Sequence, residues 1–540
     1  MTNRMFKTGA SRAQPSLLPP SVEDYVGPDN PVRAIEAYVG GLDLARLGFR
    51  YAGSVGGGAG QPPYDPADLL KLYLYGYLNQ IRSSRRLERE AGRNLELIWL
   101  LQGLRPGYRT IAKFRKDNWA ALKAANRSFV LLARELGLVG GTLVAIDGAF
   151  FDGNASKGSI ATRKRLSAEL AAIERDIEAY GAALEASDCA EADPPGGDDR
   201  GRGGGGDVGR EMATLMAERA ERRAELARLA ESGETQVSRT DADARLLTKN
   251  GQTVAGYNVQ IAVDDAHKLI VASAVVNDGN DVGQLHAMAQ AAREALAAET
   301  LSVVADGGYY NGATLKRCEE DSIVAYVPPG ERTGGLAARG CLTHAAFTYD
   351  AAADVYRCPA GAELRPTKTP KRNAAGKLEL RYLSRKAVCE ACPLRPRCIT
   401  AKSGRREVYR WVHEDVLDRH RARMQDAGAL MRRRAALAEH PFGTLKCRAG
   451  YRHFLVRGFN AVSGEWSLMA LCYNFTRVLN ILGLDAFVAT MAERAAELLL
   501  FFLRRAVRLA FGVSEALLSW PMAGLARITA VGCVHLRTAA

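Results

Sequence analysis

The chain has 540 residues, of which 47% are hydrophobic and 25% are charged, and this composition is typical of a globular protein rather than a disordered or fibrous one. Lysine and arginine exceed aspartate and glutamate by 73 to 60, a formal net charge of +13, which favours polyanionic partners and above all nucleic acid. The chain opens without an apolar segment and contains no uncharged apolar run of about 18 residues. We therefore expect neither a signal peptide nor a membrane span, and predict a cytoplasmic protein.

The first 62 residues are rich in glycine and proline and predict a poorly ordered lead-in. Residues 63–138 then turn helical, beginning where Asp65 can cap a helix that starts at Pro66. Short helices, tight polar turns and clustered basic residues favour a DNA-binding domain similar to a helix-turn-helix. The basic residues that we expect to touch DNA are Arg85, Arg86, Arg109 and Lys113. The alternative is a helical bundle whose basic faces are simply solvated.

The stretch LVAIDGAFFDGNAS begins a predicted sheet in residues 139–160. Leu143–Ile146 have the pattern of a buried strand, and that strand delivers Asp147 at its end. A buried carboxylate must be hydrogen-bonded, paired or bound to a cation, although an aspartate that merely starts a turn is the ordinary alternative. Asp152 competes with Asp147 as a metal ligand, and we favour Asp147 because it follows the strand directly.

Residues 161–236 form a predicted insertion. Apolar residues recur there at alternating steps of four and three, which is the seam of a coiled coil. They are Leu166, Leu170, Ile173, Ile177, Tyr180 and Leu184. The stretch EADPPGGDDRGRGGGGD interrupts the pattern, and a second charged helix follows from about Glu211 to Ser232. We predict a helical hairpin that serves as an interaction arm.

Strand patterns return over residues 237–334, in TVAGYNVQIAVD, KLIVASAVVND, LSVVAD and SIVAYVPP, with a helical pattern between the second and third. This order predicts a mixed sheet with helices packed on it. LSVVAD releases Asp306 into a turn, as LVAID releases Asp147. If the two strands are neighbours, the carboxylates raise each other's pKa unless a cation lies between them, and Mg²⁺ or Mn²⁺ suits oxygen ligands. Asn280 and Asp281 are expected to start a helix rather than to contribute to catalysis.

Residues 335–404 carry most of the chain's clustered cysteines. One Cys-x-x-Cys pair with two outlying cysteines can form a four-cysteine zinc site, whose members would be Cys358, Cys389, Cys392 and Cys398. Thiols without metal remain the alternative.

A long basic helix is predicted from Val412 to His440, ended or kinked by Pro441, within residues 405–482. Glu439 in this helix is the candidate for a third acid. Basic residues there can contact phosphates, and interleaved aromatic residues can stack on bases. The basic candidates are Arg434, Lys446 and Arg452, and the aromatic ones are Phe442, Tyr451 and Phe454. Alternatively the helix is solvated and Glu439 pairs with a neighbouring arginine. Residues 483–540 predict a helical tail without an assigned role.

Four fragments in this order resemble the DDE transposases of bacterial insertion sequences, of the large group with an N-terminal helical domain and a cysteine-bearing insertion before the catalytic glutamate. They are AIDGAFFDGNAS, VAGYNVQIAVDDAHKLIVASAVVNDGNDVGQL, VVADGGYYNG and EHPFGTLKCRAGYRHFLVRG, and the resemblance runs from about Phe6 to about Leu482. It implies an α/β fold with an RNase H-like mixed-sheet core, an N-terminal all-helical domain, an inserted helical hairpin and an inserted zinc-ribbon-like segment. It also implies Asp147, Asp306 and Glu439 as a metal-binding catalytic triad.

The resemblance further implies a transposase that binds terminal inverted repeats and catalyses metal-dependent DNA cleavage and strand transfer. Its partners would be double-stranded DNA, as element ends and as target, and a second copy in a homodimer on that DNA at the bacterial nucleoid. In the family's signature around the glutamate, Glu439 and Lys446 fit, Arg434 fits within one residue, and Met431 departs from the expected tyrosine. The alternatives are an RNase H-like metal nuclease without strand transfer and a catalytically dead DNA-binding remnant.

Overall fold

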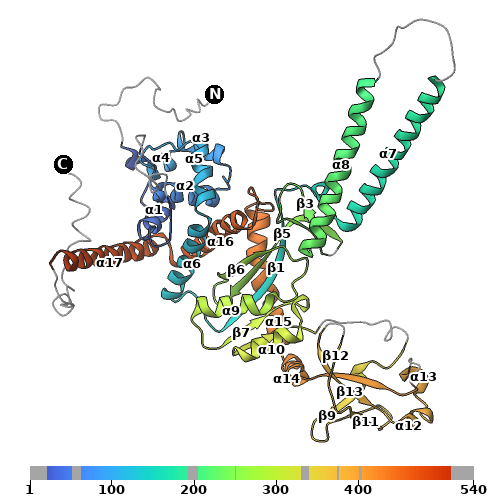
Figure 1. Cartoon of the computed structure of the whole chain (residues 1–540). Helices are drawn as coiled ribbons and strands as arrows, with labels where there is room; N and C mark the ends of the chain where they lie inside the picture. Colours follow the sequence, from blue (N-terminus) through green and yellow to red (C-terminus); the bar gives the residue numbers. More distant parts are fainter. Residues whose placement is uncertain are drawn as a thin grey trace, which may run out of the picture. The chain divides into compact units, whose positions relative to one another are not determined.

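The computed structural model of the chain describes residues 21–50, 62–191, 205–249, 251–329, 340–373, 376–399 and 404–511. The chain divides into two compact units, residues 1–121 with 475–540, and residues 122–474 (Figure 1). The described part of the first unit is helical, whereas the second contains two six-stranded sheets. A mixed α/β protein with a helical N-terminal region is therefore confirmed.

Helices alone build the described part of the first unit. They are η1 (Val22–Tyr25), α1 (Val32–Gly40), α2 (Pro66–Leu78), α3 (Ser84–Ala91), α4 (Leu95–Leu100), α5 (Tyr108–Asp117) and α17 (Leu484–Phe511), while α6 (Trp119–Glu135) and α16 (Phe459–Leu482) continue into the second unit. The predicted start of α2 is confirmed, because the Asp65 side chain accepts a hydrogen bond from the Ala67 amide and Pro66 opens the helix.

Helix α1 differs from the lead-in expected over residues 1–62. Val32, Ile35 and Tyr38 are buried at helical spacing, so this short segment contributes a packed face. Residues 1–20 and 51–61 of the predicted lead-in lie outside the described residues. The C-terminal helix α17 packs against α1 and buries Phe487 and Met491. The tail is thus part of the helical unit's core.

The first sheet of the second unit is mixed, as predicted. Its strands are β1 (Leu143–Asp152), β4 (Arg245–Lys249), β5 (Gln252–Asp264), β6 (Ile270–Val276), β7 (Leu301–Val304) and β8 (Ile323–Tyr326). They follow the order β4-β5-β1-β7-β8, and β6 also pairs with the long strand β5. Strand β1 is antiparallel to β5 and parallel to β7, and β7 is parallel to β8. Strand β1 is therefore central, and both of its faces are buried.

Helices cover each face of this sheet with a separate apolar cluster. On one face, Val144 and Ile146 of β1 pack with α9 (Gln284–Leu296) and α10 (Gly312–Glu320). On the other face, Ala145 of β1 and Val304 of β7 pack with Leu437 of α15 (Gly428–Gly443). Successive residues of a strand point to opposite faces, so this division fixes the side to which every β1 side chain points.

The predicted helical hairpin is present as α7 (Arg163–Glu191) and α8 (Gly205–Ser232), which run side by side in Figure 1. The seam residues Leu166 and Ile173 are buried near its base, whereas Leu184 is 38% exposed. The base begins at η3 (Lys157–Ser159) and a small ladder of β2 (Ile160–Thr162) with β3 (Gln236–Ser238).

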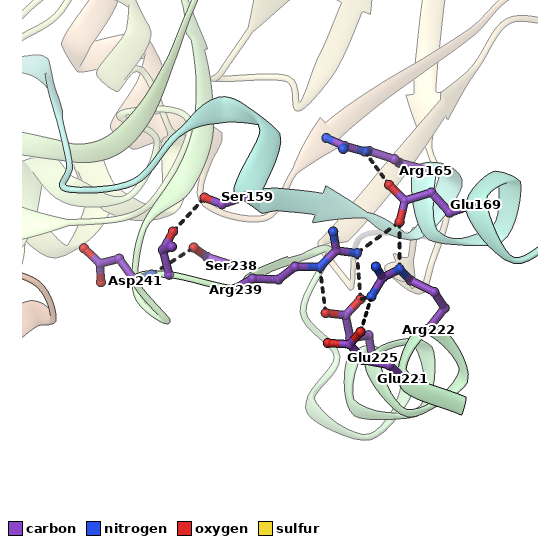
Figure 2. A network of polar contacts seen from close by, with 10 residues as sticks. Ser159, Arg165, Glu169, Glu221, Arg222, Glu225, Ser238, Arg239 and Asp241 are labelled. Carbon is purple, nitrogen blue, oxygen red and sulfur yellow. Dashed lines mark hydrogen bonds and ion pairs between the residues drawn. The ribbon is translucent and has the colours of Figure 1, made fainter. Parts of the chain in front are cut away.

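An ion-pair network fastens this base (Figure 2). Glu225, with a side chain only 2% exposed, accepts two hydrogen bonds of 2.9 Å from Arg239 and lies 3.6 Å from Arg222. Glu169 of α7 lies 3.0 Å from both arginines. Because a buried charge is costly without partners, this network holds α7, α8 and β3 together.

The cysteine-bearing segment folds around an antiparallel sheet. Its strands are β9 (Thr348–Asp350), β10 (Val355–Arg357), β11 (Glu363–Pro366), β12 (Lys371–Arg372), β13 (Leu378–Leu383) and β14 (Glu407–Trp411), accompanied by η5 (His344–Ala346), α12 (Lys386–Glu390) and α13 (Arg395–Cys398). Phe347, Tyr356 and Tyr382 form its core. Strand β14 pairs with β13, so this subdomain extends past the predicted boundary at residue 404.

The long helix predicted from Val412 to His440 is two helices, α14 (Glu414–Gln425) and α15. The break falls at Asp426 and Ala427, and Ala427 is buried. Helix α15 continues through Pro441 to Gly443 and passes into η6 (Thr444–Arg448), a turn of π-helix. Of the two effects expected of Pro441, the helix end is therefore not observed, and Pro441 is itself buried.

Within the described residues, no single helix has the length and apolar character needed to cross a membrane, and α16 with Leu484–Glu497 reaches both only as a pair bent by 110°.

Candidate active site

Asp147 and Asp306 lie at the same level of two neighbouring parallel strands. Asp306 follows the end of β7, as predicted, but Asp147 does not stand at a strand end: β1 continues to Asp152, and Asp147 pairs with Ile261 of β5 in mid-strand. Ala145 of β1 pairs with Val304 of β7, and each aspartate stands two residues beyond its member of that pair. Since side chains two residues apart share a face, both aspartates point to the side covered by α15. The register therefore brings together two carboxylates that are 159 residues apart in sequence.

The electrostatics of Asp147 agree with this placement. Burial raises the pKa of Asp147 to about 6; the backbone amide of Gly148 opposes this, and the charge of Asp306 raises it further. Arg434 and Lys249 act on Asp147 in the opposite direction. Asp306 accepts a hydrogen bond of 2.8 Å from the Gly308 amide, in the turn η4 (Gly307–Tyr309). The two aspartates thus repel each other at a partly buried site, where a cation would relieve the cost.

Helix α15 places Glu439 beside this face. Leu437 and Ala438 are buried against Ala145 and Val304, and Glu439 follows them with an exposed side chain. The next turns of the helix carry Pro441 and the π-helical residues of η6. A π-turn shifts the side chains that follow it, and such turns are frequent at functional sites.

Lys446, in η6, folds back onto β1. Its Nζ donates a hydrogen bond of 2.7 Å to the Phe150 carbonyl and lies 4.4 Å from the centre of the Phe151 ring. Burial lowers the pKa of Lys446, while the charges of Asp152 and Asp147 oppose that change. The charges of Lys446 and Arg434, the basic residues of the predicted signature, therefore both interact with that of Asp147.

The segment after η6 clasps the end of β1. The Asp152 amide donates to the Arg452 carbonyl at 3.0 Å, and the Phe454 amide donates to the Asp152 carbonyl at 2.8 Å. Arg457 donates to the carbonyl of Asn154 at 3.0 Å. Arg452 itself is exposed. Two of the sequence fragments that carried the resemblance are thus neighbours in the fold.

The aromatic residues of this stretch are buried and present no exposed ring for stacking on bases, contrary to expectation. Phe442, Tyr451 and Phe454 are 7%, 2% and 1% exposed. Phe442 and Phe454 surround Phe151, and Trp466 of α16 meets the same ring edge-on at 5.5 Å. They form the core that fixes α15 and α16 to β1, because aromatic rings buried in such contacts contribute mainly packing energy.

Asp281 has a role that the sequence did not indicate. The amino-terminal cap of α9 is Gly283, and the Asp281 side chain turns away from the helix toward Asn258, Gln260 and Lys249. It is 5% exposed. Burial raises the pKa of Tyr309, and the charges of Asp281, Asp147 and Asp306 all act in the same direction. A second polar group thus lies close to the two aspartates.

The predicted DNA-contacting residues of the helical unit lie on α3 and α5, which pack together. Arg85 and Arg109 both lie over the ring of Tyr108, at 5.3 and 5.9 Å. Together with Arg86 they are exposed. Lys113 is exposed as well but pairs with Asp117 at 2.5 Å, so part of its charge is already compensated.

The four predicted zinc ligands line one cavity of about 200 Å³ in the cysteine-bearing subdomain: Cys358, Cys389, Cys392 and Cys398. None of them is in a disulfide. The Cys358 sulfur accepts a hydrogen bond from the Ala362 amide at 3.3 Å, and burial raises the pKa of the Cys398 thiol. The four cysteines thus share one cavity, but their side chains are not arranged as the ligands of one metal ion.

Nowhere in the described ranges are three or more His, Cys, Asp or Glu side chains arranged to hold a metal ion. The donor chemistry nevertheless fits hard divalent cations at Asp147 and Asp306, since both supply carboxylate oxygens. The ionised form of Asp147 is disfavoured by burial and by the charge of Asp306, and a bound cation would stabilise it. Closure of such a site would need Glu439 to turn toward the two aspartates.

Comparison with known families gives two matches. Residues 357–479, which include the four cysteines, Glu439 and Lys446, match a family described as Transposase DDE domain. Residues 20–117, which include α1 to α5, match a family described as Transposase domain (DUF772). No curated protein and no solved structure matches the chain.

Proposed function

The chain belongs to the DDE transposases of insertion sequences, and from this premise we propose that it cuts DNA at the terminal inverted repeats of its element and joins the freed ends to target DNA. The catalytic residues in this proposal are Asp147, Asp306 and Glu439. The observation that carries it is the β1–β7 register, which sets the two aspartates level on the face that α15 covers.

An RNase H-like core is part of the same proposal. Its support is the mixed sheet, in which one acid lies on β1, a second follows the adjacent parallel strand β7, and a third comes from a helix packed on them. In such a site, two divalent ions would activate the attacking oxygen and stabilise the leaving oxygen of an in-line displacement. Asp147 and Asp306 would hold them from the strands and Glu439 from the helix.

The basic residues around the site would hold the substrate. Arg434 and Lys446, both within electrostatic reach of Asp147, would neutralise phosphates beside the scissile bond. Lys446 is fixed by its bond to Phe150, so its charge would be positioned before DNA arrives. Arg452, exposed at the end of β1, would contact the backbone further along.

Recognition of the terminal repeats would fall to the helical unit, whose exposed Arg85, Arg86 and Arg109 lie on α3 and α5. Two copies would bridge the two ends of the element on the nucleoid. The helical hairpin is one candidate for contacts between them, because its base is held rigidly by Glu225 and Arg239.

Structural zinc in the cysteine cavity is a separate proposal, supported by the four cysteines that line this cavity, whose side chains would have to turn toward a shared ion. Metal analysis of the purified chain would find about one zinc per molecule, and Cys389→Ser would lose it. Protein that carries no zinc above background would end this proposal without touching the catalytic one.

The test of the main proposal uses a labelled duplex that carries the DNA flanking this gene, with a plasmid as target and Mg²⁺ present. The wild-type chain is expected to cut the duplex and join it to the plasmid. Asp306→Asn should lower cutting at least about a hundredfold with little change in binding, because it removes a metal ligand and no DNA contact. The matched control is Asp152→Asn, an exposed aspartate on the same strand as Asp147, which should cut normally.

Two other results would favour the alternatives. Cut ends that are never joined would favour a nuclease without strand transfer, and tight binding without any cutting would favour a DNA-binding remnant. Normal cutting by Asp306→Asn would overturn the assignment of the triad.

A further inference from the structure

A buried polar cluster lies behind β1, on the face opposite to Asp147. It consists of Asn258 and Gln260 of β5, Asp281 before α9 and Tyr309 after β7, and we call it the support cluster. Gln260 pairs with Gly148 across the sheet, so the cluster begins one residue after Asp147 and on the other side of the strand. Asn258, Gln260 and Tyr309 are fully buried.

Hydrogen bonds connect the four side chains. Asp281 Oδ1 accepts from Asn258 Nδ2 at 2.9 Å and from Gln260 Nε2 at 2.7 Å. The Tyr309 hydroxyl donates to Gln260 Oε1. Gln260 therefore uses both ends of its amide and links the carboxylate of Asp281 to Tyr309. At the rim, Lys249 reaches Asp281 Oδ2 at 3.3 Å.

The cluster lies directly against the backbone that carries the two aspartates. A Cβ at position 148 would lie 2.3 Å from Gln260 Nε2 and 2.6 Å from Asp281 Oδ1, so any other residue after Asp147 would displace these two side chains. A Cβ at position 308 would lie 3.7 Å from Asp281 Oδ2, in the turn that begins at Asp306. Tyr309 ends that turn.

We propose that the support cluster is a positioning device, which fixes the β1 backbone at Gly148 relative to the turn after β7 and so sets the spacing of Asp147 and Asp306. This inference rests on the proposed function. Gly148 follows Asp147 in the chain, and Tyr309 ends the turn that Asp306 begins. Gln260, bonded to both Asp281 and Tyr309, lies between these two segments. A fully satisfied buried network has one low-energy arrangement, whereas an apolar filling would allow β1 and the turn after β7 to shift. Groups behind a metal ligand commonly change metal affinity by tenfold or more.

The test compares two substitutions of the same kind. Tyr309→Phe removes one buried hydroxyl from the support cluster. Tyr257→Phe removes one buried hydroxyl from the same sheet but outside the cluster, where it donates to Asp241 at 2.8 Å. Mn²⁺ binding to the full chain is measured by calorimetry, and the thermal midpoint is measured without metal. Both variants should lose stability, but only Tyr309→Phe should weaken Mn²⁺ binding, by about tenfold.

Activity provides a second readout. For Tyr309→Phe, the Mn²⁺ concentration that gives half-maximal cutting should rise about tenfold, while the rate at saturating Mn²⁺ stays close to that of the wild type. Asp281→Asn keeps the shape of the side chain but replaces the charged acceptor of the bonds from Asn258 and Gln260 by a neutral amide oxygen, which weakens both bonds. It should behave in the same way and serves if Tyr309→Phe does not fold.

The outcomes separate this inference from the proposed function. If Asp147→Asn binds Mn²⁺ as the wild type does, the catalytic site itself is wrong and the inference falls with it. If binding depends on Asp147 but Tyr309→Phe and Asp281→Asn match Tyr257→Phe, the support cluster only stabilises the fold. A complete loss of binding in Asp281→Asn would make Asp281 a ligand and would also overturn the positioning role.

Discussion

Replacing Asp147 by asparagine should stabilise the metal-free protein. The pKa of this aspartate is about 6 in the fold against an ordinary 3.8, mainly because its charged form is buried. Each unit of difference corresponds to about 1.4 kcal/mol, so ionised Asp147 costs about 3 kcal/mol of folding free energy. The folded protein binds its proton more tightly than the unfolded chain. The cost is therefore absent below about pH 4, grows between pH 4 and 6, and is complete above pH 6.

Urea unfolding of the two proteins in EDTA, at pH 4, 5, 6 and 7, measures this effect. Asp147→Asn should match the wild type at pH 4 and exceed it by about 3 kcal/mol at pH 7. Addition of Mg²⁺ should then stabilise only the wild type, since ligands stabilise the state that binds them.

Asp264→Asn is the matched control. Asp264 is fully buried in the same sheet, and its carboxylate accepts hydrogen bonds from the amides of Gly140, Ala266 and His267 at 2.9 to 3.2 Å. In asparagine an NH₂ group would replace one of the two acceptor oxygens and would point at backbone N–H donors. The variant should therefore lose about 1–3 kcal/mol of unfolding free energy. If Asp147→Asn were equally destabilising at pH 7, Asp147 would be a structural aspartate and the electrostatic argument for a cation would fail.

Three other predictions concern different parts of the molecule. Mn²⁺ affinity should rise about tenfold per pH unit up to pH 6 and then level off, because Asp147 must ionise to bind; a constant affinity from pH 5 to 7 would contradict this. Arg109→Ala should weaken binding to the flanking-DNA duplex and lower the slope of log affinity against log salt by about 1, whereas Arg93→Ala, already paired with Glu90, should change it little. Glu225→Ala should lower the free energy of unfolding by about 3 kcal/mol, because Glu225 is buried. Glu221 pairs with Arg222 as Glu225 does but is 60% exposed, so Glu221→Ala should lower it by under about 0.5 kcal/mol, and equal losses would refute the buried network.

The sequence predicts what depends on local pattern. A run of β-formers followed by an aspartate marks both β1 and β7, although β1 continues past Asp147 to Asp152, and the heptad spacing marks the α7 and α8 hairpin. Their partners do not follow from such patterns. The register that pairs Ala145 with Val304 depends on how the sheet packs. A shift of one residue in either strand would turn its aspartate to the other face of the sheet.

Other features cannot be predicted because the same short sequence pattern is compatible with two different local structures. Asp281 precedes α9 as a capping residue would, and only the fold shows that Asn258 and Gln260, on a strand about 20 residues earlier, bind its carboxylate. Phe442 lies in the last turn of α15 and Phe454 in the irregular segment after η6, so no single periodicity over this stretch separates the buried side from the exposed one. Helix α1 is short and lies among glycine and proline, so its buried face is too small a signal.

The central claim is geometric, and crystals of the chain with bound DNA ends and Mn²⁺ would test it most directly. Anomalous scattering locates the manganese without reference to any assumed ligand. The account predicts a manganese peak at about 2.1 Å from carboxylate oxygens of both Asp147 and Asp306, with Glu439 turned toward it. Manganese held by other residues, or by one of these aspartates without the other, would contradict it.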